Sequence, residues 1–157
     1  MLLFTLSLYA QERIIALAPS ISEIIFALGK GDEIVGVSEY ASYPKEVKKI
    51  TKVGGYSNPS LEKIFSLDPT LVIGQSHYNK TLRQLEKLGI KTLSLEMITI
   101  ATIQDSIEKI ALALKADPRP LLDPIDKAMK KAQKSKRTNQ TVLIVYGLSL
   151  DMNRGLY

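Results

Sequence analysis

Five ring-bearing side chains lie in short polar segments, most of which directly follow an apolar run. They are Tyr40, Tyr43, Tyr56, His77 and Tyr78. Rings with one polar edge can stack on a large planar or amphipathic ligand and also hydrogen-bond to it. These residues therefore predict a binding site for such a ligand. The alternative is that they are half-buried loop rings with hydrated polar atoms, as most surface tyrosines are.

Side chains that would support bond-making chemistry are sparse. His77 is the single histidine and has no obvious acid partner, so the residues do not predict a Ser-His-Asp arrangement. A site for a free transition metal needs several converging nitrogen, thiolate or carboxylate ligands, and the chain has no cysteine. We therefore expect no enzyme activity and no free-metal site, although His77 could cap a metal that a chelating ligand already holds.

The net charge of +5 could indicate an anionic partner. Many of the lysines, however, lie in residues 43–52 and 127–137, on expected polar helix faces or turns, without the pattern of a nucleic-acid module. We predict no nucleic-acid binding. Residues 1–10, MLLFTLSLYA, are apolar and end in a small residue, which predicts a signal-peptide remnant; a first strand or a tail is the alternative.

Alternating apolar runs and helical patterns give the fold class. Strands are expected at residues 13–18, 34–37, 71–73 and 92–95, and helices near residues 20–28, 45–49, 59–67 and 81–88. Such alternation pairs strands in parallel through right-handed crossovers, which predicts a three-layer α/β domain with a parallel sheet. Ligands of these sheets lie beyond the carboxyl ends of the strands, where the loops add four residues to the predicted site: Pro19, Ser20, Gln75 and Ser76.

Cap residues predict where two of the helices begin. Ser20 and Glu23 have the spacing of a capping box, and Asn58 followed by Pro59 has the pattern of an N-cap and a first helical residue. Gly54 predicts a sharp turn before the second of these helices. Four apolar residues of that helix should face the core: Leu61, Ile64, Phe65 and Leu67.

The last part of the chain predicts the beginning of a second lobe. Residues 102–115 have an amphipathic helical pattern, and the polar helix expected at residues 121–136 would be a surface connector. Residues 141–146, TVLIVY, form an apolar strand with no following sheet to join. We expect a first lobe at 11–118, a connector at 119–138 and the start of a truncated second lobe at 139–157.

A family resemblance covers residues 13–147, with its most specific parts in the first helix, the YASYP loop and the run SLEKIFSLDPTLVIG. The chain resembles the first lobe of the substrate-binding proteins that serve ABC importers of cobalamin, ferric siderophores and haem. It is similar in detail to the cobalamin-binding members. The resemblance implies two α/β lobes joined by one long rigid helix, with the ligand in the cleft between the lobes.

The resemblance also implies roles for single residues. Tyr56 falls where the cobalamin-binding members have an aromatic ring that packs on the ligand, and Tyr40 or Tyr43 falls at another ring of the pocket wall. Gln75 stands where those members have a second aromatic residue, which departs from the cobalamin pattern. Glu62 matches the glutamate that docks onto arginines of the membrane permease.

The implied function is that of a periplasmic, extracytoplasmic substrate-binding component for a metal-chelate nutrient. Its partners would be an ABC permease with its ATPase and the small-molecule chelate, the membrane would be reached only through the permease, and no cofactor is implied. A sensor or protein-interaction lobe that uses the same loop edge stays an alternative, as does a hydrolytic enzyme. Because one lobe holds half of a cleft, we expect the chain alone to bind ligand weakly.

Overall fold

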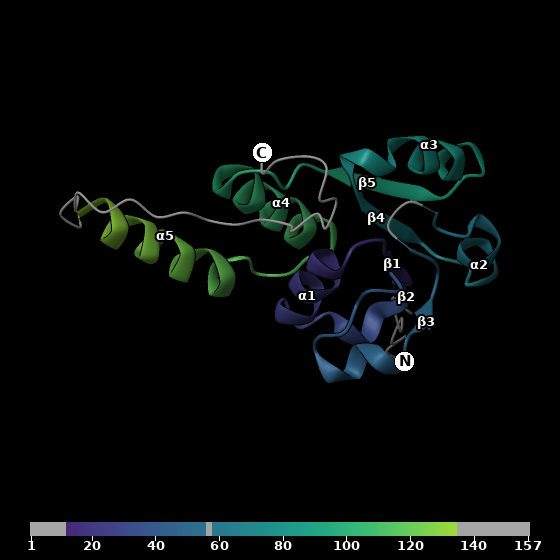
Figure 1. Cartoon of the computed structure of the whole chain (residues 1–157), viewed down its shortest axis with the longest axis horizontal. Helices are drawn as coiled ribbons and strands as arrows, with labels where there is room; N and C mark the ends of the chain where they lie inside the picture. Colours follow the sequence, from purple (N-terminus) through teal and green to yellow (C-terminus); the bar gives the residue numbers. More distant parts are fainter. Residues whose placement is uncertain (1–11, 56–57, 135–157) are drawn as a thin grey trace, which may run out of the picture.

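The fold, seen in a computed structural model that describes residues 12–55 and 58–134, centres on one parallel sheet (Figure 1). Its five strands are β1 (Ile14–Ala16), β2 (Ile34–Val37), β3 (Thr51–Lys52), β4 (Leu71–Gln75) and β5 (Lys91–Leu95). They lie in the order β3-β2-β1-β4-β5, and every pair is parallel. The predicted parallel α/β sheet is confirmed.

Helices cover both faces of the sheet, so the domain has the three layers that the sequence predicts. On one face α1 (Pro19–Ala27) and α4 (Ile100–Ala113) pack on the strands, and on the other face lie α2 (Leu61–Ser66) and α3 (Asn79–Lys87). The first core cluster includes Ile14, Ala16, Ile21, Ile25 and Ile110. The second includes Ile15, Val72, Ile64, Leu82 and Leu85. Alternate residues of β1 thus point to opposite faces, as the strand period requires.

Both predicted helix starts are wrong. The N-cap of α1 is Ala18, which makes no side-chain cap bond, and Pro19 occupies the first helical turn, so Ser20 and Glu23 form no capping box. The helix α2 begins at Leu61 with Ser60 as N-cap, whose hydroxyl accepts a hydrogen bond from the backbone N–H of Lys63 at 3.2 Å. Asn58 and Pro59 precede this helix because Pro59 pairs with Gly54 in an isolated bridge.

The short α2 helix also differs from the sequence prediction in its buried face. Ile64 is fully buried and Leu61 and Leu67 are half-buried, but the Phe65 side chain is 59% exposed. The prediction that Phe65 faces the core is therefore wrong. The helix ends as predicted, because Leu67 is the C-cap and Asp68 takes a positive φ of 45° before Pro69.

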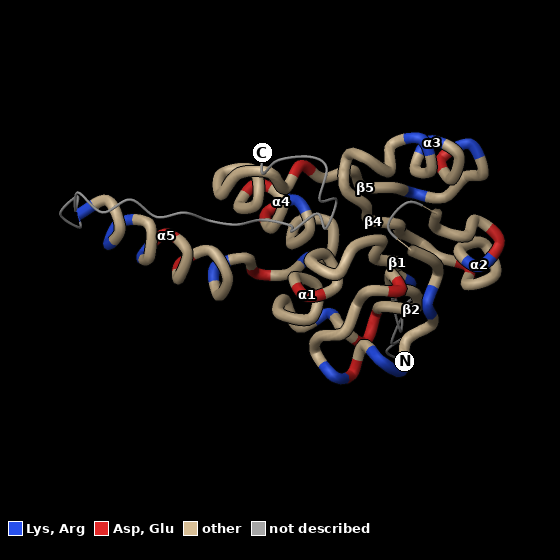
Figure 2. Tube along the Cα trace, in the orientation of Figure 1, with Lys and Arg blue, Asp and Glu red and all other residues tan. Residues whose placement is uncertain are grey.

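Three short 3-10 helices connect the strands: η1 (Gly31–Glu33), η2 (Lys45–Lys49) and η3 (Ser76–Tyr78). The predicted short helix near residues 45–49 is confirmed as η2. In Figure 2, Lys and Arg are spread over several elements, with acidic residues among them. The absence of nucleic-acid binding stays a prediction.

The helix α5 (Arg119–Lys134) projects from the rest of the domain (Figure 1) and buries none of its residues. One link to the domain is the hydrogen bond from Gln104 Nε2 of α4 to Asp126 Oδ1, at 2.7 Å. The predicted polar helix is thus present, and its role as a connector stays a prediction. The predictions for residues 1–10 and 141–146 lie outside the described residues. Within residues 12–55 and 58–134, no helix is long and apolar enough to cross a membrane.

Candidate functional site

The candidate site is the carboxyl edge of the sheet, formed by the segments that follow the strands. The chain begins at the centre of the sheet, winds outward to β3 and then passes to β4 on the other side of β1, so the topological switch lies between β1 and β4. Open parallel sheets bind their ligands at such a point. Pro19 and Ser20 follow β1, and Gln75 ends β4. These three predicted residues therefore flank the switch point, and all are half-buried.

A polar cluster of Ser20, Gln75 and Met97, which we call the central cluster, occupies the middle of this edge. Gln75 Nε2 lies 3.4 Å from Ser20 Oγ and 3.7 Å from Met97 Sδ, and Ser20 Oγ lies 3.9 Å from the same sulfur. Ser20 lies in the first turn of α1 after β1, Gln75 ends β4, and Met97 follows β5 by two residues. Hydrogen bonds join the three side chains. Sequence reasoning missed Met97, whose signal was its position two residues after the predicted strand ending at Leu95.

The loops after β2 and β3 meet beside Tyr40. The backbone N–H of Glu39 donates to Gly54 O at 2.8 Å, and a β-carbon built on Gly55 would lie 3.6 Å from Cε2 of Tyr40. The Tyr40 side chain is 63% exposed. Tyr40 is therefore an accessible ring next to the turn that leads to Tyr56, and Tyr56 itself lies outside the described residues.

Lys52 stabilises the loop that carries Tyr40 through a hydrogen bond to its backbone. Its ammonium Nζ donates to Ala41 O at 2.7 Å, and burial lowers the pKa of Lys52. The backbone N–H of Ser38 donates to Ala16 O at 3.0 Å, which ties the same loop to β1. The Lys52 charge is thus engaged by the loop itself.

Tyr43 lies in a different place from Tyr40. It lines a pocket of about 200 Å³ with Glu23, Phe26, Ala27 and Pro44, beside the second and third turns of α1. Since α1 runs away from the carboxyl edge, this position is on the flank of the helix. The resemblance left Tyr40 and Tyr43 as alternatives for a ring of the pocket wall, and of the two Tyr40 lies closer to the Gly55 turn.

The loop after β4 separates its two rings. His77 is exposed in η3, whereas Tyr78 is 3% exposed and belongs to the second core cluster, with its ring centroid 4.0 Å from that of His77. Burial lowers the pKa of His77. The expectation that Tyr78 presents its ring on the edge is wrong, because its ring packs under the loop against Gly74. Ser76 is half-buried beside Gln75.

Glu62 lies on the exposed side of α2, the helix that follows the β3 loop. Within the described part of the chain it makes no ion pair. The side chain is therefore available to a cation of a partner, as the docking role requires.

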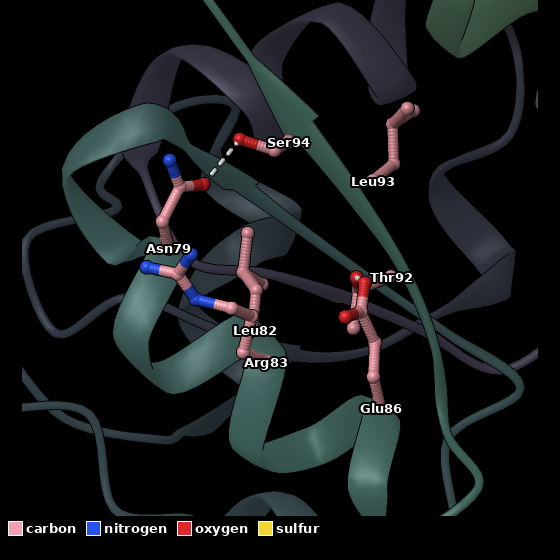
Figure 3. Close-up of a pocket in the computed structure, with 7 residues that line it drawn as sticks. All are labelled: Asn79, Leu82, Arg83, Glu86, Thr92, Leu93 and Ser94. Atoms are coloured by element: carbon pink, nitrogen blue, oxygen red, sulfur yellow. Dashed lines mark hydrogen bonds between the residues drawn. The ribbon is translucent and has the colours of Figure 1, made fainter.

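A pocket of about 310 Å³ between α3 and the edge strand β5 is the main competing location (Figure 3). Its polar groups are largely paired with one another, because Ser94 Oγ donates to Asn79 Oδ1 at 2.7 Å and Thr92 Oγ1 donates to Glu86 Oε1. A ligand would have to break these bonds. Among the described residues, no group of three or more His, Asp or Glu side chains could hold a metal ion.

Comparison with known proteins finds relatives over most of this chain. Residues 14–155 match the sequence profile of a periplasmic binding protein family. The vitamin B12-binding protein of Vibrio vulnificus is 41% identical over 115 residues, covering 71% of this chain and 42% of that protein. An uncharacterized ABC transporter substrate-binding lipoprotein of Bacillus subtilis is 39% identical over 124 residues, with coverages of 76% and 38%.

A solved structure supports the fold assignment. The periplasmic haem-binding protein of Roseiflexus sp. RS-1, in apo form, superposes with a TM-score of 0.62 at 38% identity, covering 67% of this chain and 41% of that one. This chain spans about two-fifths of the length of these relatives, because the matches cover 42%, 38% and 41% of them.

Proposed function

Because the chain belongs to the periplasmic binding protein family, we propose that it is one lobe of the extracytoplasmic substrate-binding component of an ABC importer. The proposed ligand is a metal-chelate nutrient: cobalamin, a ferric siderophore or haem. The observation that carries the proposal is the position of the central cluster at the switch point of a doubly wound sheet, with the exposed Tyr40 on the same edge. The names of the relatives supply cobalamin and haem, and the family resemblance adds the ferric siderophores.

In this proposal the carboxyl edge is one half of a cleft, and a second lobe supplies the other half. The Tyr40 ring and, by the family resemblance, the Tyr56 ring contact the apolar face of the chelate, while Pro19, Ser20, Gln75, Ser76 and His77 form the remaining wall. The lobe performs no chemistry. It holds the ligand by apolar and stacking contacts, and the partner ATPase supplies the energy of transport.

A titration tests the ligand-binding part of the proposal. The gene's complete product is titrated with cyanocobalamin, haemin and a ferric siderophore while tyrosine fluorescence is followed. We expect at least one of these chelates to bind with micromolar affinity or better. Failure of all three to bind would refute the proposed ligand class, and binding of a peptide or another protein at this edge would favour the sensor or protein-interaction alternative.

We also propose that Glu62 docks the lobe onto cations of the permease. The proposal rests on the family resemblance and on an exposed carboxylate without an ion pair among the described residues. Glu62→Lys should leave ligand affinity unchanged and reduce permease-dependent uptake, because a like charge would face the permease cations. Glu108→Lys, which makes the same charge change on the exposed side of α4, is the matched control. Equal uptake by the two variants would remove Glu62 from this role.

A further inference from the structure

The orientation of the Gln75 amide is fixed by the chemistry of its two neighbours. A thioether sulfur has no hydrogen to donate and can only accept, so the amide group that faces Met97 Sδ must be the N–H end. The sulfur lies 3.7 Å from Gln75 Nε2, and Ser20 Oγ lies 3.4 Å from the same nitrogen. Both amide hydrogens therefore have acceptors inside the central cluster.

The same contacts leave the side-chain oxygen of Gln75, Oε1, available to accept a hydrogen bond from a ligand. The hydroxyl hydrogen of Ser20 is directed to Met97 Sδ, at 3.9 Å, so it does not serve Gln75 Oε1. Within the described part of the chain, Gln75 Oε1 accepts no hydrogen bond, and the side chain is half-buried. The central cluster thus presents a carbonyl oxygen, with two acceptor sites, at the switch point of the sheet.

The charge near the cluster has the sign that a hydrogen-bond donor prefers. The three segments that build this part of the edge are residues 17–20, 75–79 and 95–99, and they contain one acid, Glu96, and no lysine or arginine. The start of α1 adds few donors, because Pro19 has no N–H and the amides of Ile21 and Ser22 both donate to Ala18 O. Of the backbone N–H groups of residues 18–22, those of Ala18 and Ser20 make no backbone hydrogen bond within the described part of the chain.

We propose that Gln75 is a specificity-determining residue, held by Ser20 and Met97 as an acceptor, so that the site selects chelates with peripheral N–H or O–H donors over chelates with peripheral carboxylates. This inference rests on the proposed function, since it needs a chelate in the cleft. A carboxylate placed against Gln75 Oε1 would bring two acceptors together and would lose its hydration without a partner. An amide or hydroxyl placed there would gain a hydrogen bond.

The first test compares probes on the gene's complete product. Cyanocobalamin and ferrichrome carry peripheral amides or hydroxyls, and haemin carries two propionates. We expect at least one of the first two to bind at least about tenfold more tightly than haemin, which corresponds to about 1.4 kcal/mol. If haemin binds more tightly than both, the inference is wrong and the proposed function stands. If none of the three binds, the proposed function fails and the inference fails with it.

The second test changes the hydrogen-bonding character of residue 75. Gln75→Met keeps the length of the side chain and removes the acceptor, so the affinity for the preferred probe should fall about tenfold while the affinity for haemin should not fall. Gln75→Arg replaces the acceptor with donors and should reverse the preference toward haemin. Gln84→Arg, on the exposed side of α3, makes the same charge change away from the edge and should leave both affinities unchanged. Circular dichroism confirms that each variant is folded.

A third variant tests the positioning role of Met97. Met97→Leu removes the sulfur acceptor while retaining an apolar side chain of similar size, so the amide of Gln75 can turn over. The selectivity ratio between the preferred probe and haemin should then fall several-fold. A ratio that stays constant in Gln75→Met and in Met97→Leu would overturn the assignment, because a purely structural role would not change selectivity.

Discussion

Replacing Gly54 with alanine should destabilise the domain through the turn that follows β3. Gly54 has a φ of +127°, a region that side chains other than glycine rarely adopt. A β-carbon at this position would lie 2.7 Å from the backbone oxygen of Asn58 and 2.9 Å from Cα of Pro59. These contacts involve backbone atoms of the bridge between Gly54 and Pro59, so they cannot be relieved by rotating a side chain.

The expected loss of stability in Gly54→Ala follows from comparison with a second glycine, Gly29. Gly29 also has a positive φ, +74°, but a β-carbon there would meet nothing within 4 Å. Gly29→Ala should therefore cost only the backbone term of about 1 kcal/mol. Gly54→Ala should cost this term and in addition about 1–3 kcal/mol for displacing packed backbone. We expect a difference of at least about 1 kcal/mol between the two variants.

Urea unfolding followed by far-ultraviolet circular dichroism measures both variants against the unchanged chain. The transition midpoint should shift clearly further for Gly54→Ala than for Gly29→Ala, with equal slopes. Failure of Gly54→Ala alone to fold would agree with the same reasoning. Equal shifts in the two variants would show that the close approach of Gly54 to Asn58 does not determine the geometry of this loop.

Three further predictions follow from single contacts. Tyr40→Ala should weaken chelate binding by the complete gene product by about 1 kcal/mol or more, as isothermal titration would show, whereas Tyr43→Ala should have little effect because Tyr43 lies on the flank of α1; equal losses would contradict this assignment. Hydrogen bonds from the Arg119 side chain and backbone lower the pKa of Asp117 from 3.8 to about 2, so its contribution to stability is present above pH 3.8 and is lost as the pH falls toward 2; Asp117→Asn should flatten this part of an acid-unfolding curve, and an unchanged curve would count against the pair. Ile110→Ala should lower the free energy of unfolding by about 2–5 kcal/mol, since this side chain is fully buried between α4 and the sheet; a loss under 1 kcal/mol in urea would show that α4 does not seal this core.

The sequence was sufficient for four of the five strands, but not for the short edge strand β3 or for the helix starts. Buried strands such as β4 are short apolar runs, and such a run predicts a strand without knowledge of the packing around it. Helix starts depend on competing local bonds. Pro59 has the pattern of a first helical residue, yet it pairs with Gly54 across the turn, while Pro19 does begin α1 and displaces the capping box expected at Ser20. The bridge to Gly54 decided the first case, and in the second the amides of Ile21 and Ser22 donate to Ala18 O, which makes Ala18 the N-cap.

The candidate site was predictable in its location and only partly in its members. Residues at the carboxyl ends of parallel strands share one edge, which is why Ser20 and Gln75 could be placed together from the sequence. Which ring faces outward depends on the path of each loop. The turn of η3 buries Tyr78 and exposes His77, and no periodic pattern in three residues distinguishes the two. Met97 carries no ligand-like signal of its own, and its role emerges only from its contact with Gln75.

Hydrogen exchange of the complete gene product, with and without a saturating metal chelate, tests the central claim most directly. If the carboxyl edge binds the ligand, amides near Ser20, Tyr40 and Gln75 should become protected, and amides beside the pocket between α3 and β5 should not. Protection confined to that pocket or to the outer side of α4, with no change near Gln75, would contradict the account.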